Sequence, residues 1–294
     1  MDLGFLNFTT LRRRHHYLNE ELVLNRRLCP EIYLEVLPIT VHQGRVQVGG
    51  KGRPVEYILK MVRLPQERMM DEVADRGELN QEIMDRLSAR LVPFYREAAT
   101  GPRINKFGEP AVIAFNHEEN FSRTEPLAGV MLSRPLFEEI RNFARAFLAQ
   151  KRDLFLRRIR QGRIRDCHGD LHMRNICLAD GIHIFDCIEF NPRFRYGDVA
   201  ADIDFLAMDL DFHGYRDLSR HLVEGFAQAA DDPELLVMLD FYKCYRAYVR
   251  GKINAFAAQD PELTPDDRTQ ASKTAQAYFA LAGAYAQEGT RWLA

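Results

Sequence analysis

The chain has 294 residues, enough for one large domain or two lobes at the usual ~100–200 residues per domain. A hydrophobic fraction of 46% and a charged fraction of 28% are ordinary for a globular protein and exclude a disordered, collagen-like or coiled-coil chain. Lys and Arg number 40 against 42 Asp and Glu, and the resulting net charge of −2 argues against a nucleic-acid binder.

The cellular setting follows from what the sequence lacks. No run approaches the ~20 apolar residues of a membrane span. The five cysteines form no C-x-x-C pair, and the amino-terminal charges follow a very short apolar stretch, which is the reverse of a signal peptide. We therefore expect a cytoplasmic protein with reduced thiols and no membrane contact.

The amino-terminal part is predicted to be one helix followed by strands. Thr9 and Thr10 are candidate N-caps for a helix that runs to about Leu28, and Pro30 ends it. Alternating residues then predict strands at 32–37, 45–48 and 55–62, which Gly44 and the glycine-rich stretch 49–52 separate.

The remainder is predicted to be largely helical, because from Glu78 onward apolar residues recur at i+4 steps. Asp180-Gly181 is a two-residue hairpin signal between short strands at 177–178 and 182–185. Asp198 is the expected N-cap of a helix to Phe212, and Asp232-Pro233 is expected to start a helix to Ala258. A last helix is predicted over 266–288. The fold class is then α+β, with a small β-containing lobe at 1–64 and a larger helical lobe at 65–294.

The densest group of polar residues is the run C-H-G-D-L-H-M-R-N at 167–175, followed by the expected hairpin and by I-F-D at 184–186. An antiparallel hairpin at that place lets Asp170, Asn175 and Asp186 converge on one point. Oxygen ligands of this kind suit Mg²⁺, and phosphoryl transfer needs both a metal near the phosphates and a carboxylate near the attacking hydroxyl.

The pattern H-G-D-L-H-x-x-N followed by an apolar-D segment resembles the catalytic loop and metal-binding aspartate of the aminoglycoside phosphotransferase and choline kinase superfamily. Residues 184–211 and the opening DLGFLNFTTLRRR are similar to a bacterial branch of that family, which is often joined to a P-loop ATPase domain. The resemblance covers nearly the whole chain. It implies a two-lobed protein-kinase-like fold with a truncated amino-terminal lobe, and ATP- and Mg²⁺-dependent phosphoryl transfer to a hydroxyl of a small molecule.

The same resemblance implies roles for individual residues. Asp170 would be the catalytic base. His168, as a support for the loop, and Arg174 would complete the catalytic residues, and Asn175 and Asp186 would hold Mg²⁺. The nucleotide would contact Glu21 and the hinge residues Met61, Val62 and Arg63, and the structural supports would be His172, Asp198 and Asp202. No G-x-x-x-x-G-K-[ST] sequence is present, so a P-loop ATPase partner would be a separate protein.

One part of the family pattern is missing from this sequence. In such kinases a glycine-rich hairpin and a strand lysine precede the helix whose glutamate pairs with that lysine. Here the only lysines among the first hundred residues, Lys51 and Lys60, both follow the first helix. This departure fits either a chain that begins late or a catalytically silent member.

Other interpretations stay open at this point. A silent nucleotide-binding module would keep the groove without catalysis, and a metal-dependent hydrolase could use His168, Asp170 and His172 as zinc ligands. The basic run Arg157 to Arg165 is interpreted as a solvated helix end, with a phosphate or nucleic-acid patch as the alternative. The aspartates in 202–211 are either an ordinary acidic helix surface or a site for a cationic acceptor.

Overall fold

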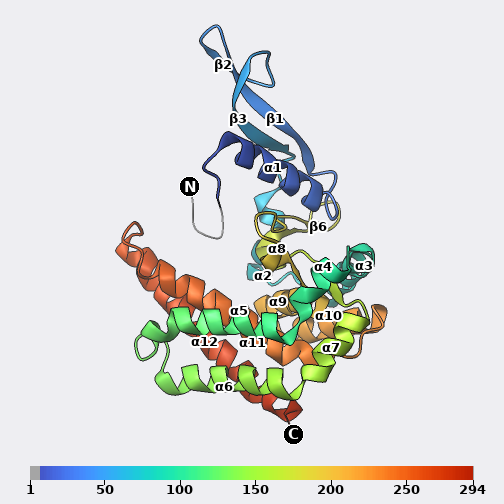
Figure 1. The fold of residues 1–294 in the computed structure, drawn as a ribbon, viewed down its shortest axis with the longest axis vertical. Coiled ribbons are helices and arrows are strands. Elements are labelled where there is room, and N and C mark those ends of the chain that lie inside the picture. Colours follow the sequence, from blue (N-terminus) through green and yellow to red (C-terminus); the bar gives the residue numbers. More distant parts are fainter. Residues whose placement is uncertain (1–6, 294) are drawn as a thin grey trace. The chain divides into compact units, whose positions relative to one another are not determined.

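The computed structural model describes residues 7–293 and shows a mixed α+β protein (Figure 1). Contacts group the chain into two compact units, which we describe separately. The sheet unit contains the described residues up to Asn80 together with His168–Tyr196, and the helical unit contains Gln81–Cys167 and the described residues from Gly197 onward. The two predicted lobes, 1–64 and 65–294, stay a prediction, because the two units are defined by contacts and have other boundaries than the lobes.

The sheet unit begins with helix α1, Leu11–Asn25. The hydroxyl of Thr10 accepts a hydrogen bond from the Arg13 amide, as expected of an N-cap. The helix ends three residues before the predicted Leu28, because the amide of Leu28 bonds to the Asn25 carbonyl in a tighter turn. Helix α1 packs against strands β1 and β3.

The sheet itself has three antiparallel strands in the order β2-β1-β3. Strand β1 spans Tyr33–His42, β2 spans Arg45–Val48 and β3 spans Arg53–Met61. Strand β1 is longer than the predicted 32–37, since its outer half pairs with β2 through Ile39 to His42. Gln43 and Gly44 both have positive φ, which is the backbone of the tight turn that joins β1 to β2.

A second hairpin in the sheet unit carries the candidate site. Strand β5, Ile176–Cys177, pairs with β6, His183–Ile184. The predicted two-residue connection at Asp180-Gly181 is wrong in length, because pairing stops at Cys177 and His183 and residues 178–182 form the loop. The unit also contains 3₁₀-helices and short α-helices: η1 Gln66–Arg68, α2 Met70–Asp75, η4 Met173–Asn175 and α8 Pro192–Arg195.

The helical unit holds the long helices, which bury the apolar stripes that the i+4 spacing predicts. Leu87 and Leu91 of α3, and Ile140 and Phe147 of α6, are almost completely buried. The α-helices are α3 Gln81–Glu97, α4 Pro102–Asn105, α5 Pro110–Thr124, α6 Arg134–Gln150, α7 Arg152–Arg160, α9 Val199–Phe212, α10 Arg216–Ala229, α11 Leu235–Ala257 and α12 Pro265–Gly289. The remaining elements are η2 Lys106–Gly108, η3 Glu125–Leu127, η5 Thr290–Trp292, β4 Ile164–Asp166 and, at the boundary between the units, β7 Tyr196–Asp198, which pairs with β4.

The core of the helical unit forms around α11. Helix α12 packs along α11 and also contacts α6. Phe241 of α11 stacks on Phe147 with ring centroids 4.6 Å apart and meets Phe155 edge to face at 5.5 Å. Aromatic pairs of this kind add to the stability that burial provides.

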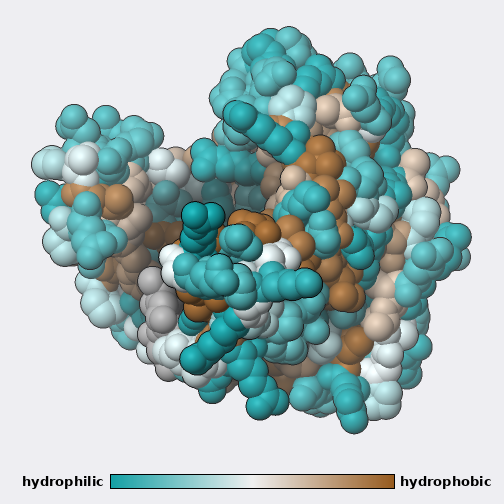
Figure 2. All heavy atoms as spheres, turned by 90° about the horizontal axis from the view of Figure 1, so that it is seen from above, coloured by the Kyte–Doolittle hydropathy of each residue, from teal (hydrophilic) through white to brown (hydrophobic). Residues whose placement is uncertain are grey.

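Hydrophilic side chains make up most of the face drawn in Figure 2, and hydrophobic side chains gather in strips between them. Within residues 7–293, none of the helices combines the length and the apolar character that crossing a bilayer requires.

Candidate active site

The buried ring of His168 fixes the backbone of residues 168–170. Nε2 of His168 lies 3.0 Å from the Phe185 carbonyl oxygen, and the Asp170 amide donates to Nδ1 at 3.3 Å. These partners assign the neutral tautomer with hydrogen on Nε2. His168 thus joins the loop to the segment after β6.

Gly169 lies where no other residue fits without strain. Its φ is +89°, and a Cβ added there would approach the Phe194 carbonyl oxygen to 2.6 Å. The backbone of the loop therefore passes directly against α8, which fixes the position of the next residue, Asp170.

The carboxylate of Asp170 is half-buried and held by two side chains. Oδ2 lies 3.3 Å from Nε2 of His172 and accepts a hydrogen bond from Nδ2 of Asn175 at 3.3 Å. Nδ2 of Asn175 also donates to the Asp170 carbonyl at 3.0 Å. Both hydrogen bonds come from Nδ2 of Asn175, and its Oδ1 accepts no hydrogen bond from the described residues.

Asp186 follows β6 in an unusual backbone conformation. Its φ is +64°, in the left-handed region that non-glycine residues seldom adopt, and its amide donates to the hydroxyl of Tyr33 at 3.2 Å. Tyr33 is buried in β1, so the sheet of this unit holds the strained residue in place. Asp186 itself is exposed.

The carboxylates of this site repel one another. Partial desolvation and the charge of Asp170 raise the pKa of Asp186, although nearby His172 opposes the shift. Desolvation and the charge of Asp186 likewise raise the pKa of Glu189. Desolvation, Glu189 and Asp186 together raise the pKa of Glu21 to about 7. Four acidic groups thus share one region, and a cation there would relieve their repulsion.

Glu189 and Tyr33 were not predicted as site residues. Glu189 is the third residue after Asp186 in a segment without regular structure, so no periodicity indicates where its side chain lies. The sequence indicates only that Tyr33 is a strand residue, and the fold brings its hydroxyl to the Asp186 amide.

The other predicted residues of the sheet unit have more ordinary surroundings. Arg174 is 74% exposed, and its Nε lies 3.3 Å from a carboxylate oxygen of Asp71. Met61 and Val62 are exposed, and the Val62 amide already donates to the Ile32 carbonyl. Val62 can therefore offer a ligand its carbonyl group, but not its amide hydrogen.

Asp198 and Asp202 belong to the helical unit and are both buried. Asp198 caps α9 by accepting from the Ala200 amide at 3.0 Å, which confirms the predicted N-cap. Asp202 accepts from the Tyr95 hydroxyl at 3.1 Å and lies 3.4 Å from Nη2 of Arg246. Both act within the packing of this unit.

Arg158 corrects the interpretation of the basic run as a solvated helix end. It is completely buried and forms two-pronged ion pairs with Asp198 and with Asp232, with N···O distances of 2.6–2.9 Å. Both carboxylates raise the pKa of its guanidinium far above the usual range, against the effect of desolvation. The same pairing explains why α11 begins at Leu235, without the predicted cap at Asp232.

The aspartates of α9 are not an acidic surface. Asp202, Asp204 and Asp209 are buried, and Asp211 pairs with Lys243 at 2.9 Å. Burial raises the pKa of Asp204 far above its usual range. The predicted site for a cationic acceptor on this helix is therefore not present.

The donor set of the site suits magnesium better than zinc. Both ring nitrogens of His168 are engaged within the protein, so His168 cannot serve as a zinc ligand. Across residues 7–293, no three His, Cys, Asp or Glu side chains are grouped closely enough to hold a metal ion. Oδ1 of Asn175 with the carboxylates of Asp170 and Asp186 offers the hard oxygen donors that Mg²⁺ takes along with phosphates and water.

Comparison with known proteins gives relatives but no function. No family model matches the chain. The chain is 30% identical over 265 residues to the uncharacterized proteins Mb2027c of Mycobacterium bovis, MT2060 of Mycobacterium tuberculosis strain CDC 1551 and Rv2004c of Mycobacterium tuberculosis strain H37Rv. The match covers 89% of this chain and 52% of each relative. The chain thus spans about half the length of the curated relatives it matches.

Proposed function

We propose that this protein is an ATP- and Mg²⁺-dependent phosphotransferase of the aminoglycoside phosphotransferase and choline kinase type, acting on a hydroxyl of a small molecule. The proposal includes the two-lobed kinase-like fold. Its main support is one arrangement: the carboxylate of Asp170, held by His172 and Asn175, lies close enough to Asp186 for their charges to repel.

In this proposal Asp170 orients the acceptor hydroxyl and takes its proton. Its Oδ2 is turned toward Asn175 and His172, which hold the carboxylate in one orientation. Positioning of this kind supplies much of the rate enhancement in phosphoryl transfer. Arg174 lies beside Asp71 at the edge of the loop, where its charge adds to the attraction for phosphates.

Mg²⁺ would be held by Asp186 and by Oδ1 of Asn175, and when bound it would neutralise charge on the phosphates. The hydrogen bonds of the Asn175 amide leave that oxygen available. The Asp186 carboxylate is already crowded by negative charge, which favours a cation beside it. Glu189 adds a further negative charge near this point.

A second candidate is a nucleotide-binding module with this fold but without catalysis. It is favoured by the surroundings of Glu21, whose charge faces other carboxylates and no lysine within the described residues. Lys60, on β3, is 53% exposed and pairs with Glu35 at 3.0 Å. The greater length of the curated relatives is compatible with a P-loop ATPase acting together with this chain, which is also a proposal.

Calorimetric titration of ATP, with and without Mg²⁺, tests the shared part of both candidates. Asp186→Asn should weaken Mg²⁺-dependent ATP binding by more than about tenfold, because a carboxylate ligand is lost. Asn is chosen because it tolerates positive φ. The matched control is Asp180→Asn, since Asp180 is exposed in the same hairpin and also has positive φ. Equal binding by both variants would contradict the proposal.

Consumption of ATP then separates the two candidates. With a panel of small hydroxyl compounds that includes an aminoglycoside and choline, an enzyme should transfer phosphate to one of them, and Asp170→Asn should abolish the transfer while ATP still binds. Full activity in Asp170→Asn would rule out the proposed base. Binding without transfer across the panel would favour the silent module.

A further inference from the structure

A pocket of about 80 Å³ lies in the helical unit. It is formed by α3, by the turn between α7 and β4, by the first residue of α9 and by the end of α10 and the segment that follows. Its main lining residues are Tyr95, Arg96, Arg163, Arg165, Phe226 and Asp232.

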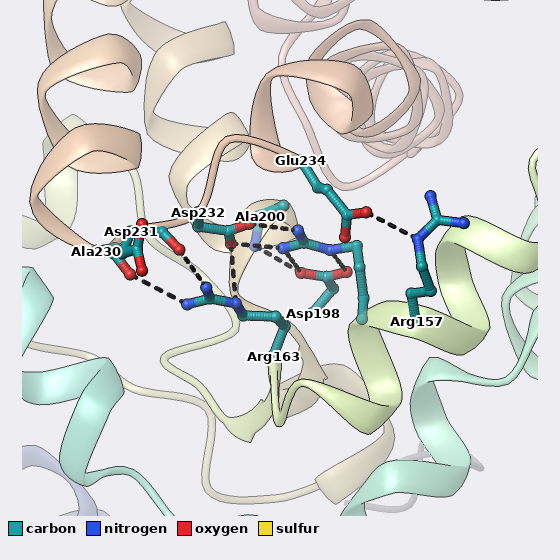
Figure 3. A network of polar contacts seen from close by, with 9 residues as sticks. Arg157, Arg163, Asp198, Ala200, Ala230, Asp231, Asp232 and Glu234 are labelled. Atoms are coloured by element: carbon teal, nitrogen blue, oxygen red, sulfur yellow. Dashed lines mark hydrogen bonds and ion pairs between the residues drawn. The ribbon is translucent and has the colours of Figure 1, made fainter.

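Two of the three arginines are fixed in place by backbone carbonyl groups. Arg165 donates from Nε to the Gly162 carbonyl at 2.7 Å and from Nη1 to the Ala98 carbonyl at 2.8 Å. Arg163 donates to the carbonyls of Ala230 and Asp231, as Figure 3 shows. The guanidinium groups are therefore oriented before any ligand arrives.

Donor capacity is left over at this pocket. Nε of Arg163 is buried without a hydrogen bond, and its nearest carboxylate oxygen, on Asp232, is 3.6 Å away. The side chain of Arg96 forms no hydrogen bond or ion pair with any residue in 7–293. Arg96 is exposed, so without a ligand its donors bond to water. An anion that accepts hydrogen bonds can replace that water and gain a charge-assisted contact.

The charges around the pocket do not balance. The buried carboxylates Asp198 and Asp232 face the guanidinium groups of Arg158 and Arg163, and these four charges offset one another. Arg96 and Arg165 remain without a carboxylate partner among the described residues. Their two positive charges stand beside an apolar wall, the rings of Tyr95 and Phe226, whose centroids are 5.8 Å apart. Low polarity beside a charge strengthens its attraction for an anion.

We propose that this pocket is a binding site for a small oxyanion of the phosphate class. Guanidinium groups match the planar pairs of oxygen atoms that such anions present, and the pocket has room for one tetrahedral anion. The inference does not depend on the proposed phosphotransferase activity, since every residue that it uses lies in the helical unit.

The test uses inorganic phosphate and the whole chain, in the absence of divalent cations. Phosphate should raise the melting temperature more than chloride does at equal ionic strength, and calorimetry should give its affinity. Arg96→Gln should weaken phosphate binding about tenfold, the usual effect of losing one hydrogen bond to a charged group. Because Arg96 holds nothing else in place, this substitution should leave the melting temperature in chloride unchanged.

Arg86→Gln is the matched control, because Arg86 is exposed on the same helix and does not line the pocket. Phenyl phosphate forms a second arm: tighter binding than inorganic phosphate assigns the pocket to a phosphate ester that uses the aromatic wall, and equal affinity assigns it to the free anion. The proposal is overturned if neither compound binds better than chloride, or if Arg96→Gln binds phosphate as well as Arg86→Gln does.

Discussion

Glu21 is the residue in which burial and charge act most clearly against ionisation. It lies on α1, and desolvation together with Glu189 and Asp186 raises its pKa from 4.5 to about 7. In the unfolded chain this carboxyl ionises near its ordinary pKa. The folded protein therefore binds more protons than the unfolded chain between these two pH values, and its stability depends on pH in that window.

As pH rises from 4.5 to about 7, the unfolded chain gains the free energy of ionising Glu21 while the folded protein does not, so the free energy of unfolding falls. Glu21→Gln should reduce this fall by on the order of 1 kcal/mol, after allowance for solvent screening of a partly exposed group. Urea denaturation across this pH range measures the effect.

Glu20→Gln provides the comparison, because it removes the neighbouring carboxylate on the same helix. A pH profile that changes equally in the two variants would mean that the fall does not come from the crowding around Glu21. The same titrations with Mg²⁺ and ATP added should show a smaller fall in the wild-type protein, if the proposed cation offsets the repulsion.

At the scale of elements, Arg158 is a link between three helices. It extends from α7 and pairs with Asp198 at the start of α9 and with Asp232 just before α11. Its guanidinium is satisfied on both edges. Removing it would leave the buried Asp198 carboxylate without an ion-pair partner and would leave Asp232 with Arg163 alone, 3.6 Å away. Buried ion pairs add little by themselves, but breaking one is costly.

We therefore expect Arg158→Met to lower the free energy of unfolding by about 3–5 kcal/mol. Arg157→Met is the natural control, because Arg157 is the next residue and pairs at 2.9 Å with Glu234, but is 46% exposed. It should cost less than about 1 kcal/mol. Chemical denaturation of both variants tests the difference, and similar losses would show that burial of the pair is not what matters.

The sequence predicts best the elements whose ends are marked by capping or turn residues. Thr10 and Asp198 were recognised as caps, and the β5–β6 hairpin follows from the turn residues at Asp180-Gly181. The sequence predicts that Asp170, Asn175 and Asp186 converge. In the structure Asn175 donates to Asp170, and the charge of Asp170 raises the pKa of Asp186. Local spacing carries this information, so no knowledge of distant contacts was needed.

What the sequence could not provide were partners that come together only in the fold. A buried arginine looks like its exposed neighbours in a basic run, because the carboxylates of Asp198 and Asp232 lie 40 and 74 residues away. Glu189 has the same difficulty. The aspartates of α9 present a related difficulty, since the sequence does not distinguish buried from exposed acidic residues.

At the scale of the whole molecule, the two proposed ligands belong to different units. Mg²⁺ with ATP should slow amide hydrogen exchange chiefly in α1 and in residues 168–196, whereas phosphate should slow exchange in α3 and around residues 162–165 and 226–232. Mass spectrometry of peptic peptides can follow both regions in one experiment. Protection of the same peptides by both ligands would contradict the assignment of two separate sites.

The division into units also bears on the order in which the protein can fold during synthesis. The sheet unit combines its first segment with His168–Tyr196, and more than eighty residues of the helical unit separate the two in the chain. The strands of the first segment are therefore synthesised well before the rest of their unit. The helical unit is completed only with α12, which packs along α11 and α6 and follows both in the chain. Neither core can close before these later segments are made, and until then the growing chain exposes apolar strands and helices to which chaperones can bind.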